Sequence, residues 1–418
     1  METRLEKGKQ IAKAGKVREK AGTWLVPSQS RTGTGYVVKF TPDGYTCDCP
    51  DYEFRHQDCK HIYAVCVVVT QRETVTERVE RVAANGAKTV TTKTVTVEKR
   101  GTYPQNWPAY NKAQTEEKHT FLRLLADLCS GIEEPAQPAT GRRHLPLRDM
   151  LFCAALKVYS TVSGRRAQCD LQDACDKGYI ARVPHFNSVF NTFEREDLTA
   201  ILERLIVTSS APLAAVEQDF AVDSTGLTTT RFVRWYDAKY GDEMAQHEWI
   251  KLHLMCGVKT NIVTSVLATH GSANDSPILP LLVGQTAARF TMRDVSADKG
   301  YISKRNLQEI MSRGAQPYIP FKSNATGGAT KGTTLWKRLY HFYEFQRETF
   351  LAHYHKRSNV ETTFHMIKSK FGDALRSKTQ VAQFNEAMCK VLCHNICVVI
   401  QSMHELGISP DFGAAQAA

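Results

Sequence analysis

The C-terminal half of the sequence alternates short apolar runs with longer amphipathic stretches. Apolar runs that end in polar or glycine-containing turns predict strands, and apolar residues that recur every three to four positions predict helices. In order, the pattern predicts strands at 218–226, 250–258 and 262–270, a helix at 276–287, a strand at 292–301, a helix at 303–314, a strand at 315–321 and helical structure from about 341 onward. This β-β-β-α-β-α-β-α order predicts an α/β domain.

The preceding residues have other patterns. Helical periodicity at 112–132, 146–164 and 186–209 predicts amphipathic helices that pack against one another. Before them, residues 70–105 alternate Val or Thr with charged residues, which predicts a β-hairpin spacer around Asn85-Gly86. Residues 1–35 are rich in Lys and Arg, and both a solvated tail and a weak phosphate-binding segment remain open for them.

Charge and composition narrow the partners and the compartment. The formal net charge of +11 over 418 residues indicates a polyanionic partner, without separating nucleic acid from acidic lipid. No apolar stretch is long enough to cross a bilayer and the N-terminus lacks the apolar core of a signal peptide, so we expect a cytoplasmic protein. In a reducing compartment, clustered cysteines among the 12 present indicate metal ligands before disulfides.

One such cluster lies near the N-terminus. Cys47 and Cys49 are separated by one residue, and so are Cys59 and His61. Three thiolates and an imidazole provide the four ligands of a tetrahedral zinc site, and a metal can replace most of the apolar core of a small module. Buried cysteines without a metal, or His56 as the fourth ligand, are the alternatives. Across roughly residues 20–68 the spacing resembles the SWIM-type zinc finger.

Two aspartates and one helix suggest a second metal site. Asp223 and Asp298 each end an apolar run and precede a small or glycine-containing turn, which suits strand ends. Acidic strand ends could hold divalent cations, although exposed turn aspartates are also common.

The segment around residue 361 is more specific. The spacing of its polar residues places four of them within an arc of roughly 60° on one helix face: Tyr354, Arg357, Glu361 and Lys368. Such a face suits a metal and phosphate site, with the carboxylate as metal ligand and the two cations as phosphate contacts. The alternative is a solvated face on which Arg357 pairs with Glu361 one turn away.

Together these motifs resemble the catalytic domain of DDE transposases of bacterial insertion sequences, over roughly residues 216–400. FAVDSTG, VSADKGY and the Tyr-Arg-Glu-Lys signature carry the resemblance. It implies a ribonuclease H-like fold, a mixed sheet flanked by helices. It also implies a catalytic triad of Asp223, Asp298 and Glu361 that binds Mg²⁺ or Mn²⁺. By the same resemblance, Tyr354, Arg357 and Lys368 would position transposon-end DNA.

The resemblance also bears on the reaction. It implies an oligomeric enzyme that cleaves and joins DNA. Some relatives carry a β-rich insertion before the Glu that assists a hairpin intermediate. Only 62 residues separate Asp298 from Glu361 here, so we expect no such insertion, and the hairpin step stays open. A transposase-derived DNA-binding or regulatory protein without catalysis, a purely hydrolytic nuclease and a zinc-dependent adaptor are the alternatives.

The sequence therefore predicts five segments: a basic tail with the zinc finger at 1–70, a β-rich spacer at 71–110, a helical DNA-binding region at 111–215, the catalytic domain at 216–405 and a tail at 406–418. Lesser candidates have plainer interpretations. Trp336 either stacks on a flipped base or packs in a core, and the second is favoured. Cys389, Cys393 and Cys397 recur every four residues and indicate a buried helix face rather than another metal site.

Overall fold

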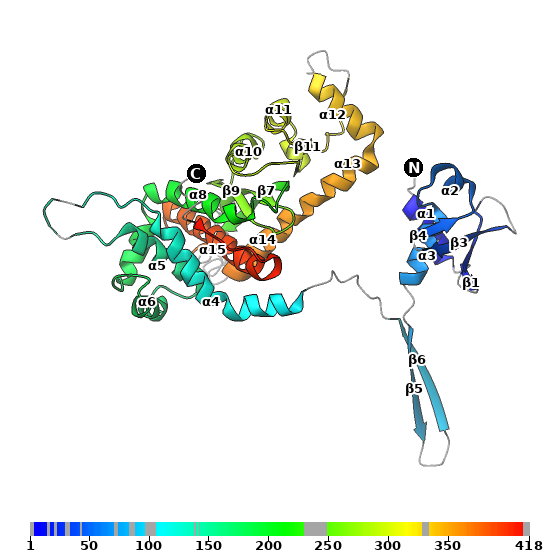
Figure 1. Cartoon of the computed structure of the whole chain (residues 1–418), viewed down its shortest axis with the longest axis horizontal. Helices are drawn as coiled ribbons and strands as arrows, with labels where there is room; N and C mark the ends of the chain where they lie inside the picture. Colours follow the sequence, from blue (N-terminus) through cyan, green and yellow to red (C-terminus); the bar gives the residue numbers. More distant parts are fainter. Residues whose placement is uncertain are drawn as a thin grey trace, which may run out of the picture. The chain divides into compact units, whose positions relative to one another are not determined.

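Two compact units make up the chain in this computed structural model, Met1–Gln105 and Asn106–Ala418 (Figure 1). The structure describes residues 4–14, 17–20, 23–29, 34–41, 44–70, 74–82, 88–96, 106–137, 139–141, 143–229, 249–327 and 334–412. None of the helices in these ranges is both long and apolar enough to cross a membrane.

The first unit contains an antiparallel sheet of order β1-β2-β3-β4 and three helices. Their bounds are β1 Arg18–Lys20, β2 Thr23–Pro27, β3 Gly35–Thr41, β4 Gly44–Cys47, α1 Arg4–Lys13, α2 Pro50–Arg55 and α3 Lys60–Thr70. The core is small, and three buried cysteines lie among its aliphatic residues. Sulfur atoms therefore take up part of the volume that a larger domain would fill with apolar side chains.

The predicted spacer hairpin forms from two long strands. Strand β5 spans Thr74–Val82 and pairs antiparallel with β6, which spans Lys88–Thr96. The predicted turn at Asn85-Gly86 lies outside the described residues.

The second unit is built on a five-stranded mixed sheet of order β11-β10-β7-β8-β9. The strands are β7 Asp219–Thr228, β8 Trp249–Gly257, β9 Val263–His270, β10 Asp294–Ala297 and β11 Gln316–Tyr318. Strands β7, β8 and β9 pair antiparallel, whereas β10 pairs in parallel with both β7 and β11. All five predicted strands and their order are confirmed, and so is the α/β fold class.

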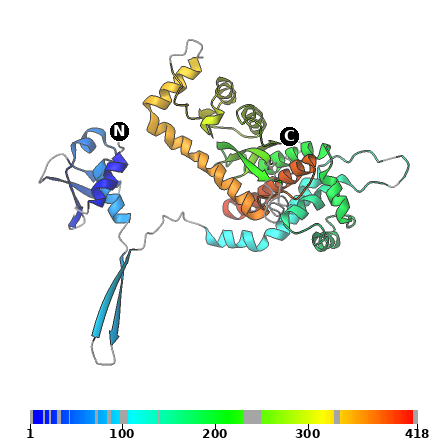
Figure 2. The same ribbon diagram turned by 180° about the vertical axis from the view of Figure 1, so that it is seen from behind.

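Helices cover both faces of this sheet (Figures 1 and 2). Those before the sheet are α4 Trp107–Ser130, α5 Leu147–Tyr159, α6 Ala167–Asp176, α7 Phe186–Phe193 and α8 Asp197–Ser210. Those that follow β9 are α10 Leu279–Ala287, α11 Lys304–Ser312, α12 Thr334–Phe345, α13 Arg347–Tyr354, α14 Ser358–Phe371 and α15 Gln380–Leu406. Short 3₁₀ turns are η1 Ala211–Leu213, η2 Lys299–Tyr301 and η3 His355–Arg357.

Local sequence explains several helix ends. The backbone N–H of Asn306 donates to Ser303 Oγ at the start of α11 (3.1 Å), and the N–H of Ala382 donates to Thr379 Oγ1 at the start of α15 (3.4 Å). Such caps satisfy donors that have no partner within the helix. Gly314 follows α11 with a φ of 80°, which confirms its predicted place at the helix end.

Two helical predictions need correction. The stretch 186–209 is two helices, α7 and α8, because the chain breaks between them and Asn385 of α15 donates to the carbonyls of Phe193 and Arg195 there (2.9 Å each). Helix α6 was not predicted, since only three of its ten residues are buried and its apolar stripe is narrow.

The two faces of the sheet contribute to different cores. Phe220 and Val222 pack with α10 and α11, whereas Ala221 packs in the core that contains α14, α15 and the helices α4–α8. Successive strand residues point to opposite faces. Asp219 and Asp223 therefore share the face of Ala221, toward α14. The predicted helical region 111–215 shares this one core with the sheet.

Strand β9 lies at an edge of the sheet, and α15 covers it with a polar side chain. The Asn395 Oδ1 atom accepts from the backbone N–H of Val263 (2.9 Å), and Nδ2 donates to the Val263 carbonyl (2.7 Å). One buried amide thus makes both hydrogen bonds that a neighbouring strand would make.

Candidate active site and zinc centre

Asp223 and Asp298 lie side by side where the parallel pairing of β7 with β10 ends. Asp298 follows the last residue of β10, as predicted for a strand end, whereas Asp223 lies within β7, which continues to Thr228, so that prediction is wrong for Asp223. Ala297 pairs with Val222 at the last recorded position of the β10–β7 ladder. Asp223 and Asp298 come next, and Asp298 keeps an extended backbone, so their Cα atoms are about 5 Å apart. Both side chains share the sheet face that is turned toward α14. The strand register thus brings together two carboxylates that are 75 positions apart in sequence.

Burial dominates the electrostatics of Asp223. It raises the pKa of this carboxyl group, and the charges of Asp298 and Asp275 raise it further. The backbone N–H of Ser224, which donates to Asp223 Oδ1 (2.8 Å), and the guanidinium of Arg357 act in the opposite direction. A partly buried acid next to another acid is the arrangement that cations stabilise best.

The segment that carries Glu361 differs from the prediction in one respect. Tyr354 ends α13, Arg357 ends the 3₁₀ turn η3, and Glu361 and Lys368 lie in α14. The four signature residues therefore do not share one uninterrupted α-helix. The turn is right-handed, so the chain direction continues through it, but its tighter winding shifts the side chains relative to the predicted arc.

Arg357 joins two members of the predicted triad. Its Nη1 atom lies 2.7 Å from Asp223 Oδ2, and its Nη2 atom lies 2.6 Å from Glu361 Oε1. The pairing of Arg357 with Glu361 is the contact expected for a solvated helix face, but the contact with Asp223 crosses from helix to sheet. Because one planar guanidinium touches both carboxylates, their contacting oxygens lie within roughly 8 Å of each other.

The acidic residues fit divalent cations by chemistry and by spacing. Mg²⁺ and Mn²⁺ prefer carboxylate oxygens, and two such ions about 4 Å apart span ligands separated by distances of this size. The oxygens of the three carboxylates lie farther apart than the ligand atoms of the Cys/His cluster described below. Among the described residues, that cluster is the one group of three or more potential metal ligands in close contact. Arg357 lies between Asp223 and Glu361, so a bound cation would replace its guanidinium as the positive charge that faces these carboxylates.

Lys368 and Tyr354 flank the acidic residues. The Lys368 Nζ atom donates to Thr225 Oγ1 (2.7 Å), which places this ammonium two residues beyond Asp223 along β7. Burial lowers the pKa of Lys368 and raises the pKa of Tyr354. The Arg357 guanidinium lies 6.0 Å from the centre of the Tyr354 ring. The structure thus brings all four signature residues close to Asp223 on β7.

Sequence reasoning missed a fourth acid. Asp275 Oδ1 accepts from Ser224 Oγ (2.9 Å) and lies 2.7 Å from Lys251 Nζ. The same oxygen is 3.3 Å from Nδ1 of the buried His253. Burial lowers the pKa of His253 to about 4. Asp275 stands in the loop between β9 and α10, and only its place after the apolar run of β9 could have indicated it.

The Cys/His cluster forms around the start of two helices. Cys47 ends β4, Cys49 precedes Pro50 at the first turn of α2, and Cys59 and His61 flank the first residue of α3. All four are buried, and their ligand atoms lie within 4.8 Å of one another. His56, the alternative ligand, ends α2 with a left-handed backbone and is exposed.

The cluster has the dimensions of a zinc site. His61 Nδ1 lies 3.9 Å from Cys47 Sγ and 3.7 Å from Cys59 Sγ. Ligands placed tetrahedrally about 2.0–2.3 Å from zinc are separated by roughly 3.5–3.8 Å. The contact with the Cys47 thiol lowers the pKa of Cys59 to about 3 and raises the pKa of Cys47. Thiolate character at this position suits a metal ligand.

Other candidates have structural roles. Trp336 packs edge-on against Phe321 (4.9 Å between ring centres) and its indole N–H donates to the Thr326 carbonyl (3.2 Å), which supports packing. Cys389 and Cys393 are buried in the core on α15, as expected for small apolar residues.

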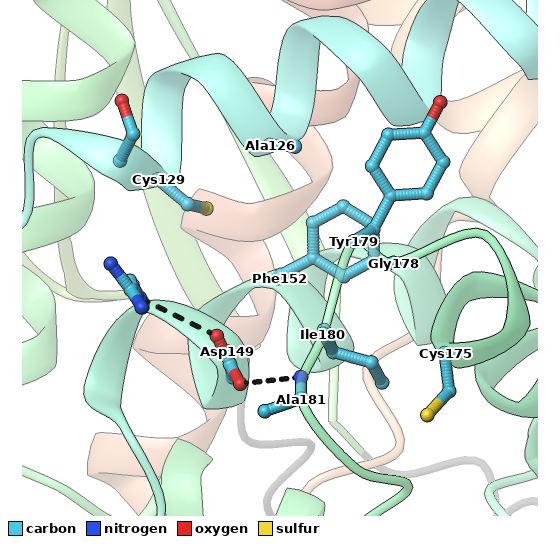
Figure 3. A pocket seen from close by; sticks show the side chains of 11 residues that line it. Ala126, Cys129, Asp149, Phe152, Cys175, Gly178, Tyr179, Ile180 and Ala181 are labelled. Carbon is cyan, nitrogen blue, oxygen red and sulfur yellow. Dashed lines mark hydrogen bonds and ion pairs between the residues drawn. The ribbon is translucent and has the colours of Figure 1, made fainter.

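Two hollows differ in chemistry. One lies among the helices α4, α5 and α6, where the Asp149 carboxylate is held by the Ala181 N–H (3.0 Å) and by Arg148 (Figure 3). The other is lined by Asp298, Lys299, Gly300, Lys322, Ser323 and Asn324. Only the second includes a member of the predicted triad, Asp298, next to two lysines.

The fold and the paired acidic residues define an α/β domain with a candidate site for divalent cations, preceded by a zinc module. Comparison with known families makes this more specific. Residues 215–396 match the family model of the transposase DDE domain, and residues 36–69 match that of the SWIM zinc finger. The chain therefore carries a transposase DDE domain, which is ribonuclease H-like, and a SWIM zinc finger. No curated protein matches the chain.

Proposed function

We propose that this protein is a transposase that cleaves DNA at insertion-sequence ends and joins the freed end to target DNA. The observation that carries the proposal is the position of Asp223 beside Asp298, directly after the last pair of the parallel β7–β10 ladder, with Glu361 linked to Asp223 through Arg357. These residues lie within the matched transposase DDE domain. The net charge of +11 supports a polyanionic substrate.

In this proposal Asp223, Asp298 and Glu361 hold Mg²⁺ or Mn²⁺. Such cations, when bound, activate the attacking oxygen and stabilise the leaving oxygen. Arg357 and Lys368 contact phosphates of the transposon end, and the Tyr354 hydroxyl donates a hydrogen bond there. Because Arg357 pairs with two carboxylates in the structure, its guanidinium must leave them to reach a phosphate.

The reaction has two steps of the same kind. Water breaks a phosphodiester bond at the element's end and frees a 3′-hydroxyl. This hydroxyl then attacks a phosphodiester of the target, so one P–O bond forms as another breaks and no high-energy cofactor is consumed. The protein would act as a homo-oligomer that pairs two ends, on DNA in the bacterial cytoplasm and nucleoid.

The remaining regions would serve recognition. We assign a structural role to Zn²⁺ held by Cys47, Cys49, Cys59 and His61, because protein ligands fill all four positions. The zinc finger and the helical region 111–215 would provide recognition of the transposon ends. The division into five segments stays a prediction.

One observation favours a second candidate function. Arg357 neutralises Asp223 and Glu361, as it would in a transposase-derived DNA-binding or regulatory protein that no longer binds catalytic cations. The two candidates differ in one measurable outcome, which is cleavage.

The test uses the full chain and DNA that includes the sequences flanking its coding region. We expect strand cleavage with Mg²⁺ or Mn²⁺, followed by a joined product, and no cleavage with Asp223→Asn or Glu361→Gln. Glu309→Gln serves as the matched control, because Glu309 lies within the DDE domain but pairs with Arg313 on the same helix, α11 (2.9 Å). DNA binding with no cleavage above the Asp223→Asn level would favour the regulatory function instead.

A further inference from the structure

The strands that carry Asp223 and Asp298 carry a second aspartate pair four residues earlier. Asp219 and Asp294 face each other as the first recorded pair of the β7–β10 ladder. Residues four apart on a strand share a face. The same sheet face therefore bears two rows of paired carboxylates, Asp219 with Asp294 and Asp223 with Asp298.

The pair of Asp219 and Asp294 is more buried than the pair of Asp223 and Asp298, and more basic side chains contact it. The side chains of Asp219 and Asp294 are 14% and 6% exposed. Arg293 contacts both oxygens of Asp219 (2.8 and 2.6 Å), and His353 Nδ1 lies 2.6 Å from Asp294 Oδ2. His353 is held in turn by stacking on Tyr318, with ring centres 4.5 Å apart.

Lys356 connects the two acids of this pair. Its Nζ atom lies 2.8 Å from Asp219 Oδ2 and 3.0 Å from Asp294 Oδ2. Lys356 and Arg357 are consecutive residues of η3, so one turn supplies a cation to each aspartate row. A buried carboxylate pair that loses its cation is strongly destabilised, so the Lys356 contact is the more costly one to break.

The side chains of Arg357 and Lys356 have different roles in the proposed reaction. In the proposed function, Arg357 leaves Asp223 and Glu361 for a phosphate. If Arg357 were the one contact between η3 and the strands, its departure would also release the start of α14, which carries Glu361. Lys356 and His353 keep this segment on β7 and β10 through residues that the reaction does not use.

We propose that Lys356, held by Asp219 and Asp294, is a positioning residue that keeps Glu361 near Asp223 and Asp298 while Arg357 exchanges partners. This inference rests on the proposed function. Neither the signature residues nor the triad includes Lys356. Its role acts through Glu361, so its removal should weaken the binding of a cation held by Glu361, in addition to the stability lost when the buried carboxylates lose their partner.

The test measures Mn²⁺ binding to the zinc-loaded full chain by electron paramagnetic resonance, with thermal unfolding measured in parallel. Lys356→Met should weaken the Mn²⁺ binding that Glu361→Gln also weakens, by about tenfold or more. Lys356→Arg should restore it. Lys370→Met is the matched control, because Lys370 pairs α14 with Glu117 of α4 (2.6 Å) and should leave Mn²⁺ binding unchanged.

A triple variant separates positioning from charge balance. Lys356→Met combined with Asp219→Asn and Asp294→Asn leaves no unpaired carboxylate, so it should regain thermal stability but still bind Mn²⁺ weakly. If Lys356→Met alone does not fold, Mn²⁺ binding of the triple variant is compared with that of the unmodified protein instead. Mn²⁺ binding of the triple variant equal to that of the unmodified protein would overturn the proposal. If Asp223→Asn and Glu361→Gln leave Mn²⁺ binding unchanged, the proposed function itself fails, whatever Lys356 does.

Discussion

Replacing Arg357 with Gln should make the metal-free site bind divalent cations more tightly. The guanidinium pairs with Asp223 and Glu361 at 2.7 and 2.6 Å, where a cation would use the same carboxylates. A cation that enters the unmodified protein therefore has to break both ion pairs. The variant presents the same carboxylates without this competitor.

The magnitude follows from the exposure of the partners. Asp223 and Arg357 are 22% and 21% exposed, so their pair resembles a hydrogen bond between charged groups, worth about 1.5–3 kcal/mol. Glu361 is 60% exposed, and its pair adds less than about 1 kcal/mol. Since about 1.4 kcal/mol corresponds to a tenfold change in affinity, Arg357→Gln should tighten Mn²⁺ binding by roughly 10- to 1,000-fold.

Isothermal titration with Mn²⁺ at pH 8, on zinc-loaded protein without DNA, measures this change. Arg347→Gln is the matched control, since Arg347 lies on α13 and pairs weakly with Glu344 (4.0 Å). DNA cleavage by Arg357→Gln should fall despite the tighter metal binding, because the phosphate contact is lost. Mn²⁺ binding equal to or weaker than that of the unmodified protein would show that the guanidinium does not compete.

Three further predictions concern stability and zinc. Burial raises the pKa of Asp223, so its ionised form costs folding free energy despite the contact with Arg357, and metal-free Asp223→Asn should be more stable than the unmodified protein at neutral pH. Differential scanning calorimetry should show this gain vanish as the pH falls through the raised pKa and the native carboxyl takes up a proton. Cys59→Ala, or a strong chelator, should release one zinc per chain and unfold residues 44–70, detected as faster amide exchange there, while exchange in β7–β9 stays unchanged. Asn395→Ala leaves the N–H and carbonyl of Val263 without these partners and should cost about 2–4 kcal/mol in urea unfolding, whereas a loss below ~0.5 kcal/mol would mean that water replaces the amide.

The strands and their order were predictable because their signals are local. Each apolar run in 218–321 ends in a turn, and Gly314 marks a helix end by its own conformation. The proximity of Asp223 and Asp298 followed less directly. It needs the parallel register of β7 and β10, which the spacing of residues in the sequence does not contain.

The contacts of the basic side chains of Arg357 and Lys356 were not predictable in this way. Helical spacing placed Arg357 near Glu361, but its contact with Asp223 depends on how α14 lies on the sheet. The 3₁₀ turn η3 has no sequence signal that distinguishes it from an α-helix. Lys356 looked like one more charge in a polar stretch, because its acidic partners are more than 60 residues away.

The Asn395 side chain also limits how copies of this protein can associate. At Val263 the backbone groups that a strand from another molecule would need are already bonded within the chain. Extending the sheet from one copy into another there would break two hydrogen bonds and displace a buried amide from α15. If copies pair two DNA ends as proposed, they would therefore not join through β9 at Val263.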